Sequence, residues 1–121
     1  MSQKKILVVD DDPSVVKLLD SILTAKGHAV VKAADGEEAL KQMKAHNPQL
    51  LILDIMMPGM NGYDVCRNLK FDSPFKDTPI LLLTSRDQEI DPRIGQMMGI
   101  EYYQKPVSRD VLLTKVEKLL K

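Results

Sequence analysis

Cysteine is almost absent from this sequence: Cys66 is the only one among 121 residues. A single cysteine excludes an internal disulfide, which is typical of proteins from a reducing compartment. The thiol could act in redox chemistry or catalysis, but a small apolar residue packed on a helix face is the favoured interpretation. A chain of this length can bury a core without disulfides, so we expect a cytoplasmic domain.

The sequence also lacks an excess of either charge and any long apolar segment. Lys plus Arg and Asp plus Glu number 17 each, which excludes a bulk positive charge that attracts nucleic acid or an anionic membrane. No apolar run approaches the ~18 residues of a membrane-spanning helix, and the segment before Asp10 is too short for a signal-peptide core. No linker, low-complexity segment or internal repeat interrupts the chain. We therefore expect residues 1–121 to form one soluble domain that contacts neither nucleic acid nor membrane.

Short apolar segments alternate along the chain with amphipathic ones. The first, third and fourth apolar segments are nearly continuous, as in strands that are buried on both faces of a parallel sheet. Helical stripes lie between them, including Val15, Leu19 and Ile22 with Val16, Leu18 and Leu23 in the first. Strict alternation predicts an α/β fold, a doubly wound (βα)5 domain with a parallel sheet and helices on both faces. The expected strands are 5–9, 29–33, 49–53, 79–84 and 100–104, and the clearest helices are 13–26, 36–46 and a C-terminal one.

Several residues mark the ends of these helices. Asp12 precedes Pro13, the arrangement of an N-cap followed by proline at the first helical position. Asp35 with Glu38 three residues later forms a capping-box pattern. Gly27 ends the first helix.

The fourth helix is the least certain element, because Pro92 lies inside its segment and an interior proline costs ~3 kcal/mol. We expect the helix to begin there, with Asp91 as its N-cap, to be short at about 92–98, and to be the least stable of the five.

Polar residues follow four of the five predicted strands. Ligands of open parallel sheets bind beyond the carboxyl ends of the strands, and neighbouring strands lie only ~4.8 Å apart. Each residue alone has an ordinary explanation as a turn former, cap or loop residue, but their joint occurrence favours a shared site. Oxygen ligands gathered in this way suit a hard divalent cation, which would relieve their repulsion. The set comprises Asp10, Asp11 and Asp12 after the first strand, Asp54 after the third, Thr84 as the last residue of the fourth, and Lys105 with Pro106 after the fifth.

Four motifs together resemble one known family. "ILVVDDDPSVVKLL", "LLILDIMMPGMNGYDVCRNLK", "PILLLTS" and "YYQKPVS" are similar to the receiver domain of two-component response regulators, and the match covers the whole chain. The resemblance implies a flavodoxin-like fold with strand order 2-1-3-4-5. It also implies a phosphoacceptor signalling domain rather than an enzyme, one that assists its own phosphorylation and slow dephosphorylation.

The resemblance assigns a role to three of the four aspartates at the strand ends. Asp54 resembles the phosphoacceptor, and Asp10 and Asp11 resemble the acidic pair. Asp11 and Asp54 would bind Mg²⁺ directly, Asp10 would act mainly through water, and the backbone carbonyl of Met56 would complete the protein ligands. Mn²⁺ could substitute. Asp12 is better interpreted as the helix N-cap.

The remaining roles concern the switch. Thr84 resembles the switch hydroxyl, and Lys105 resembles the lysine that pairs with the phosphoryl group. Tyr102 matches the aromatic switch residue, with Tyr103 as the alternative. The family also implies a cis bond between Lys105 and Pro106.

The implied function is phosphorelay signalling. A phosphohistidine on a sensor histidine kinase or phosphotransfer protein would donate the phosphoryl group to Asp54. The phosphorylated domain would then remodel the face formed by helix 4, strand 5 and helix 5, and so control an effector protein or a fused output domain. The domain would be a monomer or a phosphorylation-dependent dimer through that face.

Some positions depart from the family pattern. The segment between Gly99 and Lys105 is one residue shorter than the common form, and Ser85 stands where alanine or glycine is usual. Met56 and Arg86 flank the path of an attacking water, so we expect slow hydrolysis of the acyl phosphate.

Three other functions compete with this one. A magnesium-dependent phosphatase with an aspartyl nucleophile would need an aspartate where Met56 stands. A degenerate receiver, acting as a binding module without phosphorylation, would normally lack one of the site residues, and all are present. A phosphohistidine module would have to use His28 or His46, for which ordinary surface roles suffice.

Overall fold

The computed structural model describes residues 4–57, 59–71, 74–84 and 100–120. The predicted helix at 92–98, with Asp91, Ser85 and Arg86, lies outside these residues. The strands are β1 (Lys5–Val9), β2 (Ala29–Ala33), β3 (Leu50–Asp54), β4 (Ile80–Thr84) and β5 (Ile100–Gln104). The helices are α1 (Pro13–Ala25), α2 (Gly36–His46), α3 (Gly62–Phe71) and α5 (Arg109–Leu119).

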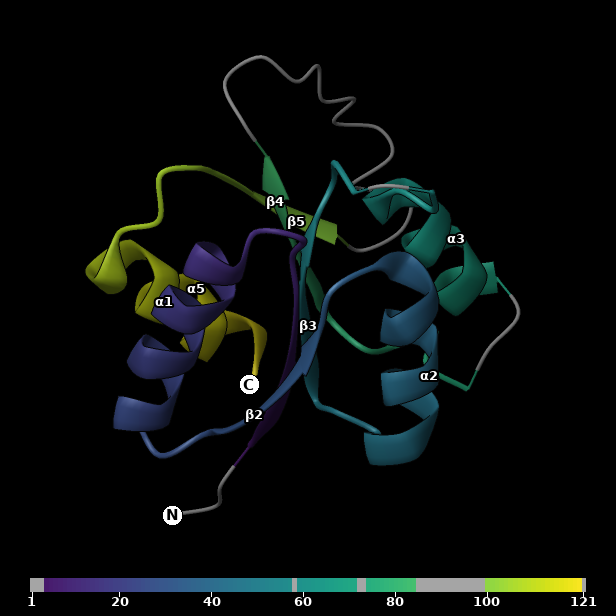
Figure 1. Ribbon diagram of the computed structural model, residues 1–121. Helices are drawn as coiled ribbons and strands as arrows, with labels where there is room; N and C mark the ends of the chain where they lie inside the picture. The colour runs from purple at the N-terminus through teal and green to yellow at the C-terminus, as the bar shows by residue number, and fades with distance from the viewer. Residues whose placement is uncertain (1–3, 58, 72–73, 85–99, 121) are drawn as a thin grey trace.

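The five strands form one parallel sheet in the order β2-β1-β3-β4-β5, which confirms the predicted α/β fold and topology. Every residue of β3 and β4 is buried, as their continuous apolar sequences predict. The sheet is seen nearly edge-on in Figure 1, with α1 and α5 on one side and α2 and α3 on the other. The chain therefore crosses the sheet between α1 and α2 but stays on one side from α2 to α3, and because the strands are parallel their carboxyl ends meet at one edge.

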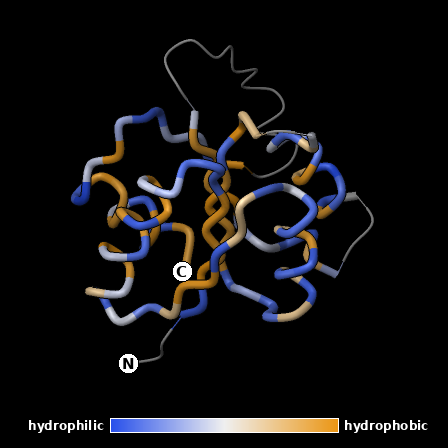
Figure 2. The backbone as a smooth tube through the Cα atoms, in the orientation of Figure 1, coloured by the Kyte–Doolittle hydropathy of each residue, from blue (hydrophilic) through white to orange (hydrophobic). Residues whose placement is uncertain are grey.

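Alternate residues of the strands feed two separate apolar clusters. In β1, Leu7 and Val9 pack with α2 and α3, whereas Ile6 and Val8 pack with α1 and α5. Figure 2 shows this apolar centre as the hydrophobic strands between hydrophilic outer turns. Leu18 differs from the expected stripe of α1, because 44% of it is exposed to solvent.

The predicted caps are present. The Asp12 carboxylate accepts a hydrogen bond from the Ser14 N–H at 2.9 Å, and Pro13 occupies the first turn of α1. The Asp35 carboxylate accepts from the Glu38 N–H at 2.8 Å. Glu38 reaches back one residue further than a standard capping box, to the N–H of Ala34 at 2.9 Å.

β3 and β4 begin one residue later than predicted, and β3 also ends one residue later, so Asp54 is its last residue rather than the residue after it. Gln49 is outside the strand, and its side-chain carbonyl accepts a hydrogen bond from the Lys5 N–H at 2.7 Å. The described helices include none with the length and apolar character needed to span a bilayer.

Candidate functional site

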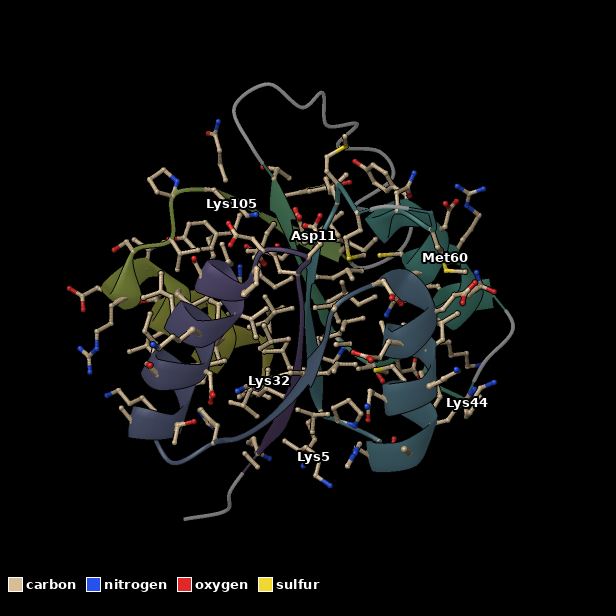
Figure 3. All side chains as sticks on the ribbon, viewed as in Figure 1. Lys5, Asp11, Lys32, Lys44, Met60 and Lys105 are labelled. Carbon is tan, nitrogen blue, oxygen red and sulfur yellow. The ribbon has the colours of Figure 1, made fainter. Side chains whose placement is uncertain are left out.

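Three carboxylates gather at the carboxyl ends of β1 and β3. Oxygens from Asp10, Asp11 and Asp54 all lie within 4.8 Å of one another. Asp10 and Asp54 are 2% and 6% exposed, so only Asp11 is open to solvent. In Figure 3, Asp11 and Lys105 lie together at the upper edge of the sheet, and Lys5 lies at the opposite end. The sequence prediction of a shared acidic site is therefore matched by the geometry.

Lys105 joins two of these carboxylates. Its ammonium nitrogen lies 3.1 Å from Oδ2 of Asp10 and 3.6 Å from Oδ1 of Asp54. Its backbone N–H donates to the Thr84 carbonyl at 2.7 Å, and the bond to Pro106 is cis, as the resemblance implied. Burial alone would lower the pKa of the ammonium, but the hydrogen bond and charge of Asp10, with the charge of Asp54, outweigh it and raise the pKa. Lys105 is thus held as a cation over the site.

Asp10 is held on both sides. One carboxylate oxygen accepts the Asp12 N–H at 2.9 Å, while the other accepts from Lys105. The Asp10 N–H donates to the Ala33 carbonyl at the end of β2. With both oxygens engaged, Asp10 is suited to act on a cation through water rather than as its main ligand.

The surroundings of Asp54 disfavour the ionised form of its carboxyl group. Burial raises the pKa of its carboxyl group, and the Asp10 charge acts in the same direction. Lys105 and a hydrogen bond from the Met56 N–H lower the pKa without cancelling the rise. The Asp54 carboxylate therefore lacks full compensation for its charge from the protein.

Such a donor set fits a hard divalent cation. The ligands are oxygens alone, their mutual repulsion is only partly offset by Lys105, and the exposed Asp11 leaves the site open to water. Magnesium prefers oxygen ligands and retains several waters, so it suits two or three carboxylates at an open edge. The arrangement can neutralise charge on a phosphoryl group that approaches Asp54.

Thr84 ends β4 beside the acidic group and is fully buried. Its hydroxyl oxygen has no hydrogen-bond partner within the described part of the chain. A buried hydroxyl of this kind gains free energy from any acceptor that arrives nearby. It has the chemistry expected of a group that responds to a phosphoryl group.

The two candidate switch tyrosines lie on opposite faces of β5. Tyr102 is partly buried, packs with the cluster of α2 and α3, and pairs in register with Leu82. Tyr103 is 8% exposed and packs with α1 and α5, where its hydroxyl accepts the Ser108 N–H at 2.7 Å. Because Thr84 follows Leu82 by two residues on the same face of β4, Tyr102 shares its face and Tyr103 does not.

Met56 combines a backbone role with an exposed side chain. Its N–H hydrogen-bonds the Asp54 carboxylate, and 64% of the residue is exposed. The backbone of Met56 is therefore tied to Asp54, while most of the residue is open to solvent. Whether its carbonyl binds a cation stays a prediction, as does every assigned role of a site residue.

Gly62 is a site residue that the sequence interpretation missed. It begins α3, donates its N–H to the Ile55 carbonyl at 2.8 Å, and lies against the backbone of Asp54. A Cβ added there would stand 2.7 Å from the Asp54 carbonyl oxygen and 2.8 Å from the Ile55 Cα. The glycine lies in the quoted motif "LLILDIMMPGMNGYDVCRNLK", but nothing in the sequence specifies this close approach.

The residues of the competing functions lie elsewhere. Cys66 is fully buried, and burial raises the pKa of its thiol to about 12, so the packing interpretation is favoured over a reactive thiol. His28 precedes β2 and His46 ends α2, both at the end of the sheet opposite the acidic site.

Comparison with known proteins decides the family. The family model for the response regulator receiver domain matches residues 6–117. The chain belongs to this family. Receiver domains are signalling domains of two-component systems, so the expectation of a signalling domain is confirmed at that level.

The most similar proteins include whole regulators and isolated receiver domains. The alkaline phosphatase synthesis transcriptional regulatory protein PhoP of Bacillus subtilis is 41% identical over 98% of this chain and 49% of its own length. Protein PilH of Pseudomonas aeruginosa is 34% identical over 96% of this chain and 97% of its own. The chain spans about half the length of the first curated relatives it matches. A crystal structure of a putative response regulator from Chloroflexus aurantiacus has a TM-score of 0.90 and 34% identity, covering 98% of both chains.

Proposed function

We propose that this receiver domain accepts a phosphoryl group on Asp54 from a phosphohistidine of a sensor histidine kinase or phosphotransfer protein. The observation that carries the proposal is the position of Lys105, whose ammonium contacts both Asp10 and Asp54 beside the exposed Asp11. A fixed cation and a buried carboxylate thus lie together at one open edge, which supports Asp54 as the proposed nucleophile. Family membership supports the same reaction.

Each residue has a defined part in the proposed transfer. An oxygen of Asp54 attacks phosphorus while the donor's imidazole nitrogen leaves in line with it. Lys105 stabilises negative charge on the transferring oxygens, and the Met56 N–H orients the nucleophile. Mg²⁺, or Mn²⁺ in its place, would be held by Asp11, Asp54 and the Met56 carbonyl, with Asp10 acting through water, and would supply further charge neutralisation.

The proposed switch begins at Thr84. A phosphoryl group on Asp54 offers an acceptor to its unpartnered hydroxyl, and Tyr102 on the same face moves toward the space that Thr84 leaves. The consequence is a changed surface on β5 and α5 together with the predicted fourth helix. The two conformations are a two-state equilibrium that the covalent phosphoryl group biases.

The relatives suggest which kind of partner would bind this surface. PhoP is named a transcriptional regulatory protein and is about twice as long as this chain, whereas PilH has nearly the same length. A fused output domain and a separate effector protein are therefore both consistent with family membership. Dimerisation through the switch face, the absence of direct nucleic-acid binding and a cytoplasmic location stay predictions.

Intact mass spectrometry after incubation with acetyl phosphate and Mg²⁺ tests the proposal. Wild type should gain one phosphoryl group, and Asp54→Asn should gain none. Chelation of the divalent cation should suppress the adduct in wild type. An adduct that persists in Asp54→Asn would contradict the assignment, and no adduct in either protein would favour the degenerate binding module.

A further inference from the structure

Tyr63 has no part in the acidic site, yet it contacts the proposed switch aromatic. Its hydroxyl oxygen lies 3.5 Å from the hydroxyl oxygen of Tyr102, across 39 positions of sequence. Both side chains are partly buried and pack against the same apolar cluster. The contact therefore joins α3 to β5 on the face that carries the Thr84 hydroxyl.

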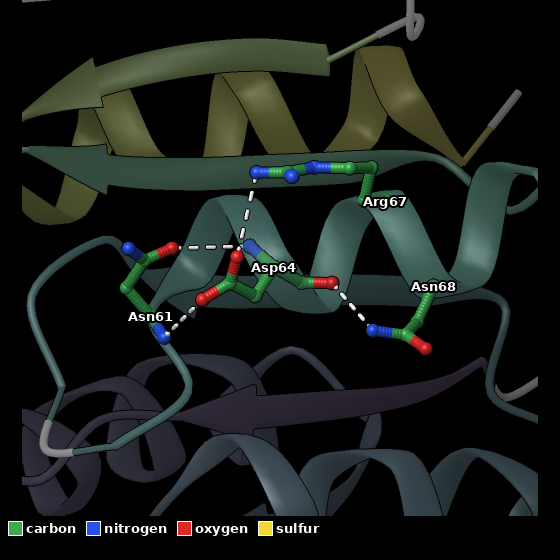
Figure 4. A network of polar contacts seen from close by, with 4 residues as sticks. All are labelled: Asn61, Asp64, Arg67 and Asn68. Carbon is green, nitrogen blue, oxygen red and sulfur yellow. Dashed lines mark hydrogen bonds and ion pairs between the residues drawn. The ribbon is translucent and has the colours of Figure 1, made fainter.

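The first turn of α3 holds Tyr63 in place. Asn61 and Asp64 form a reciprocal cap, in which the Asn61 side-chain oxygen accepts the Asp64 N–H at 3.0 Å and the Asp64 carboxylate accepts the Asn61 N–H at 3.2 Å (Figure 4). Asn68 donates to the Asp64 carbonyl one turn later. Tyr63 lies between these capping residues, so its backbone has little freedom to shift alone.

The same turn is also tied to the phosphoacceptor. Gly62, directly before Tyr63, lies so close to Asp54 that a Cβ would meet its carbonyl oxygen at 2.7 Å. The Gly62 N–H donates to the Ile55 carbonyl, which fixes the turn to the residue after Asp54. A movement of the Asp54 backbone must therefore be followed by Gly62 and Tyr63.

The hydroxyl pair has room to shorten. At 3.5 Å the oxygens are further apart than the ~2.5–3.0 Å of a relaxed O–H···O hydrogen bond. Leu83, directly before Thr84, pairs with Asp54 in the sheet, and Gly62, directly before Tyr63, packs on Asp54, so both tyrosines lie on elements that adjoin the segments around Asp54. A conformation in which the two hydroxyl oxygens come closer would strengthen the hydrogen bond.

We propose that Tyr63 is a second positioning residue of the switch, which stabilises the phosphorylated conformation through its hydroxyl contact with Tyr102. This forms a route from Asp54 through Gly62 and Tyr63 to Tyr102, beside the route through Thr84. The inference rests on the proposed phosphorylation of Asp54. A connection of this kind is established only by measured coupling, which sets the form of the test.

The test is a double-mutant cycle on the full chain. Wild type, Tyr63→Phe, Tyr102→Phe and the double variant are titrated with beryllofluoride, a phosphoryl mimic, in excess Mg²⁺, and backbone amide NMR gives the apparent dissociation constant. Tyr63→Phe should weaken binding about 2- to 10-fold, the range of one hydrogen bond. Tyr102→Phe should act similarly, and the double variant should weaken binding no further than the stronger single change.

Tyr103→Phe is the matched control, because it removes a hydroxyl from the next residue of β5 that bonds Ser108 on the opposite face. It should retain wild-type affinity. Unchanged or improved affinity in Tyr63→Phe, or effects that multiply in the double variant, would overturn the proposal while beryllofluoride binding by wild type leaves the phosphoacceptor function standing. If wild type neither binds beryllofluoride nor forms the acyl phosphate, the proposed function fails and this inference fails with it.

Discussion

Three aspartates follow one another after β1, and the structure gives each different surroundings. Asp10 is buried and engaged on both oxygens, and Asp11 is exposed beside Asp54. Asp12 turns to the helix and caps α1. Identical side chains in adjacent positions thus differ in chemistry, because the first follows the strand, the second lies in the loop and the third caps the helix.

Alanine substitutions should separate two of these roles. Asp11→Ala should abolish Mg²⁺-dependent phosphorylation, because the open ligand is lost. Asp12→Ala should retain it and lower the free energy of unfolding by about 1 kcal/mol, the usual value of an N-cap. Adduct mass and urea unfolding measure the two effects, and equal loss of phosphorylation in both variants would refute the division.

Met56 should control the lifetime of the acyl phosphate. We predict that this exposed apolar residue, two positions after Asp54, shields the phosphoryl group from water, so Met56→Asn should shorten the phosphoryl half-life. The time course of adduct loss after removal of acetyl phosphate gives that half-life. Leu18→Asn replaces another exposed apolar residue on α1 and should leave it unchanged. Equal half-lives in Met56→Asn and wild type would sink the shielding hypothesis.

At the scale of elements, the β3–α3 connection positions Asp54, the proposed phosphoacceptor. α3 can begin directly against the end of β3 only because its first residue has no Cβ. The reciprocal Asn61–Asp64 cap then fixes the helix in that close position. The backbone of Asp54 is therefore held in position by the first residue of α3 as well as by the neighbouring strands.

Gly62→Ala should disturb this support. The added methyl group meets backbone atoms at under 3 Å, which forces α3 away from β3 and should cost about 1–3 kcal/mol of stability while slowing phosphorylation. Gly27→Ala is the control: its φ of 88° makes alanine strained, but no atom lies within 4 Å of the added Cβ. Gly27→Ala should lose stability and keep the phosphorylation rate, measured by urea unfolding and by adduct formation against time. Wild-type rates in Gly62→Ala would contradict the role of this contact.

The element order, the sheet and most of the site could be predicted, because apolar runs and strand-end residues depend on local sequence and simple topology. The Gly62 contact could not, since it depends on how closely α3 packs on β3. Leu18 fits the apolar periodicity of α1 and is nevertheless exposed. Periodicity predicts which face of a helix is apolar, but it does not predict how much of that face the sheet and neighbouring helices bury. The sequence did not specify which of Tyr102 and Tyr103 faces Thr84, and only the strand register places Tyr102 on that face; its switch role stays a prediction.

At the scale of the whole molecule, the negative charge of Asp54 opposes folding when no cation is bound. The pKa of Asp54 is raised by burial and by Asp10, so the fold favours its protonated form. A carboxyl group with a raised pKa in the folded state stabilises the protein below its unfolded pKa of ~3.9 and loses that contribution as pH rises through the folded value. The ionised form of Asp54 at neutral pH therefore lowers the free energy of unfolding.

Asp54→Asn should therefore be more stable than wild type at pH 7 in the presence of a chelator. The advantage should shrink as pH falls toward 4, because wild-type Asp54 becomes protonated there. Urea unfolding at the two pH values measures the difference. Asp64→Asn alters a carboxylate of the α3 cap outside the acidic site, and it should show no such gain at pH 7. A wild type more stable than Asp54→Asn at pH 7 would contradict the charge conflict.

The central claim is that Asp54 carries the phosphoryl group, and chemical trapping tests it most directly. Borohydride reduces an aspartyl phosphate to homoserine, so the protein is phosphorylated with acetyl phosphate and Mg²⁺, reduced, digested and sequenced by mass spectrometry. We predict homoserine at position 54 and unmodified aspartate at positions 10 and 11. Homoserine at either of those positions, or an unreduced Asp54 in a protein that carries the adduct, would contradict the account.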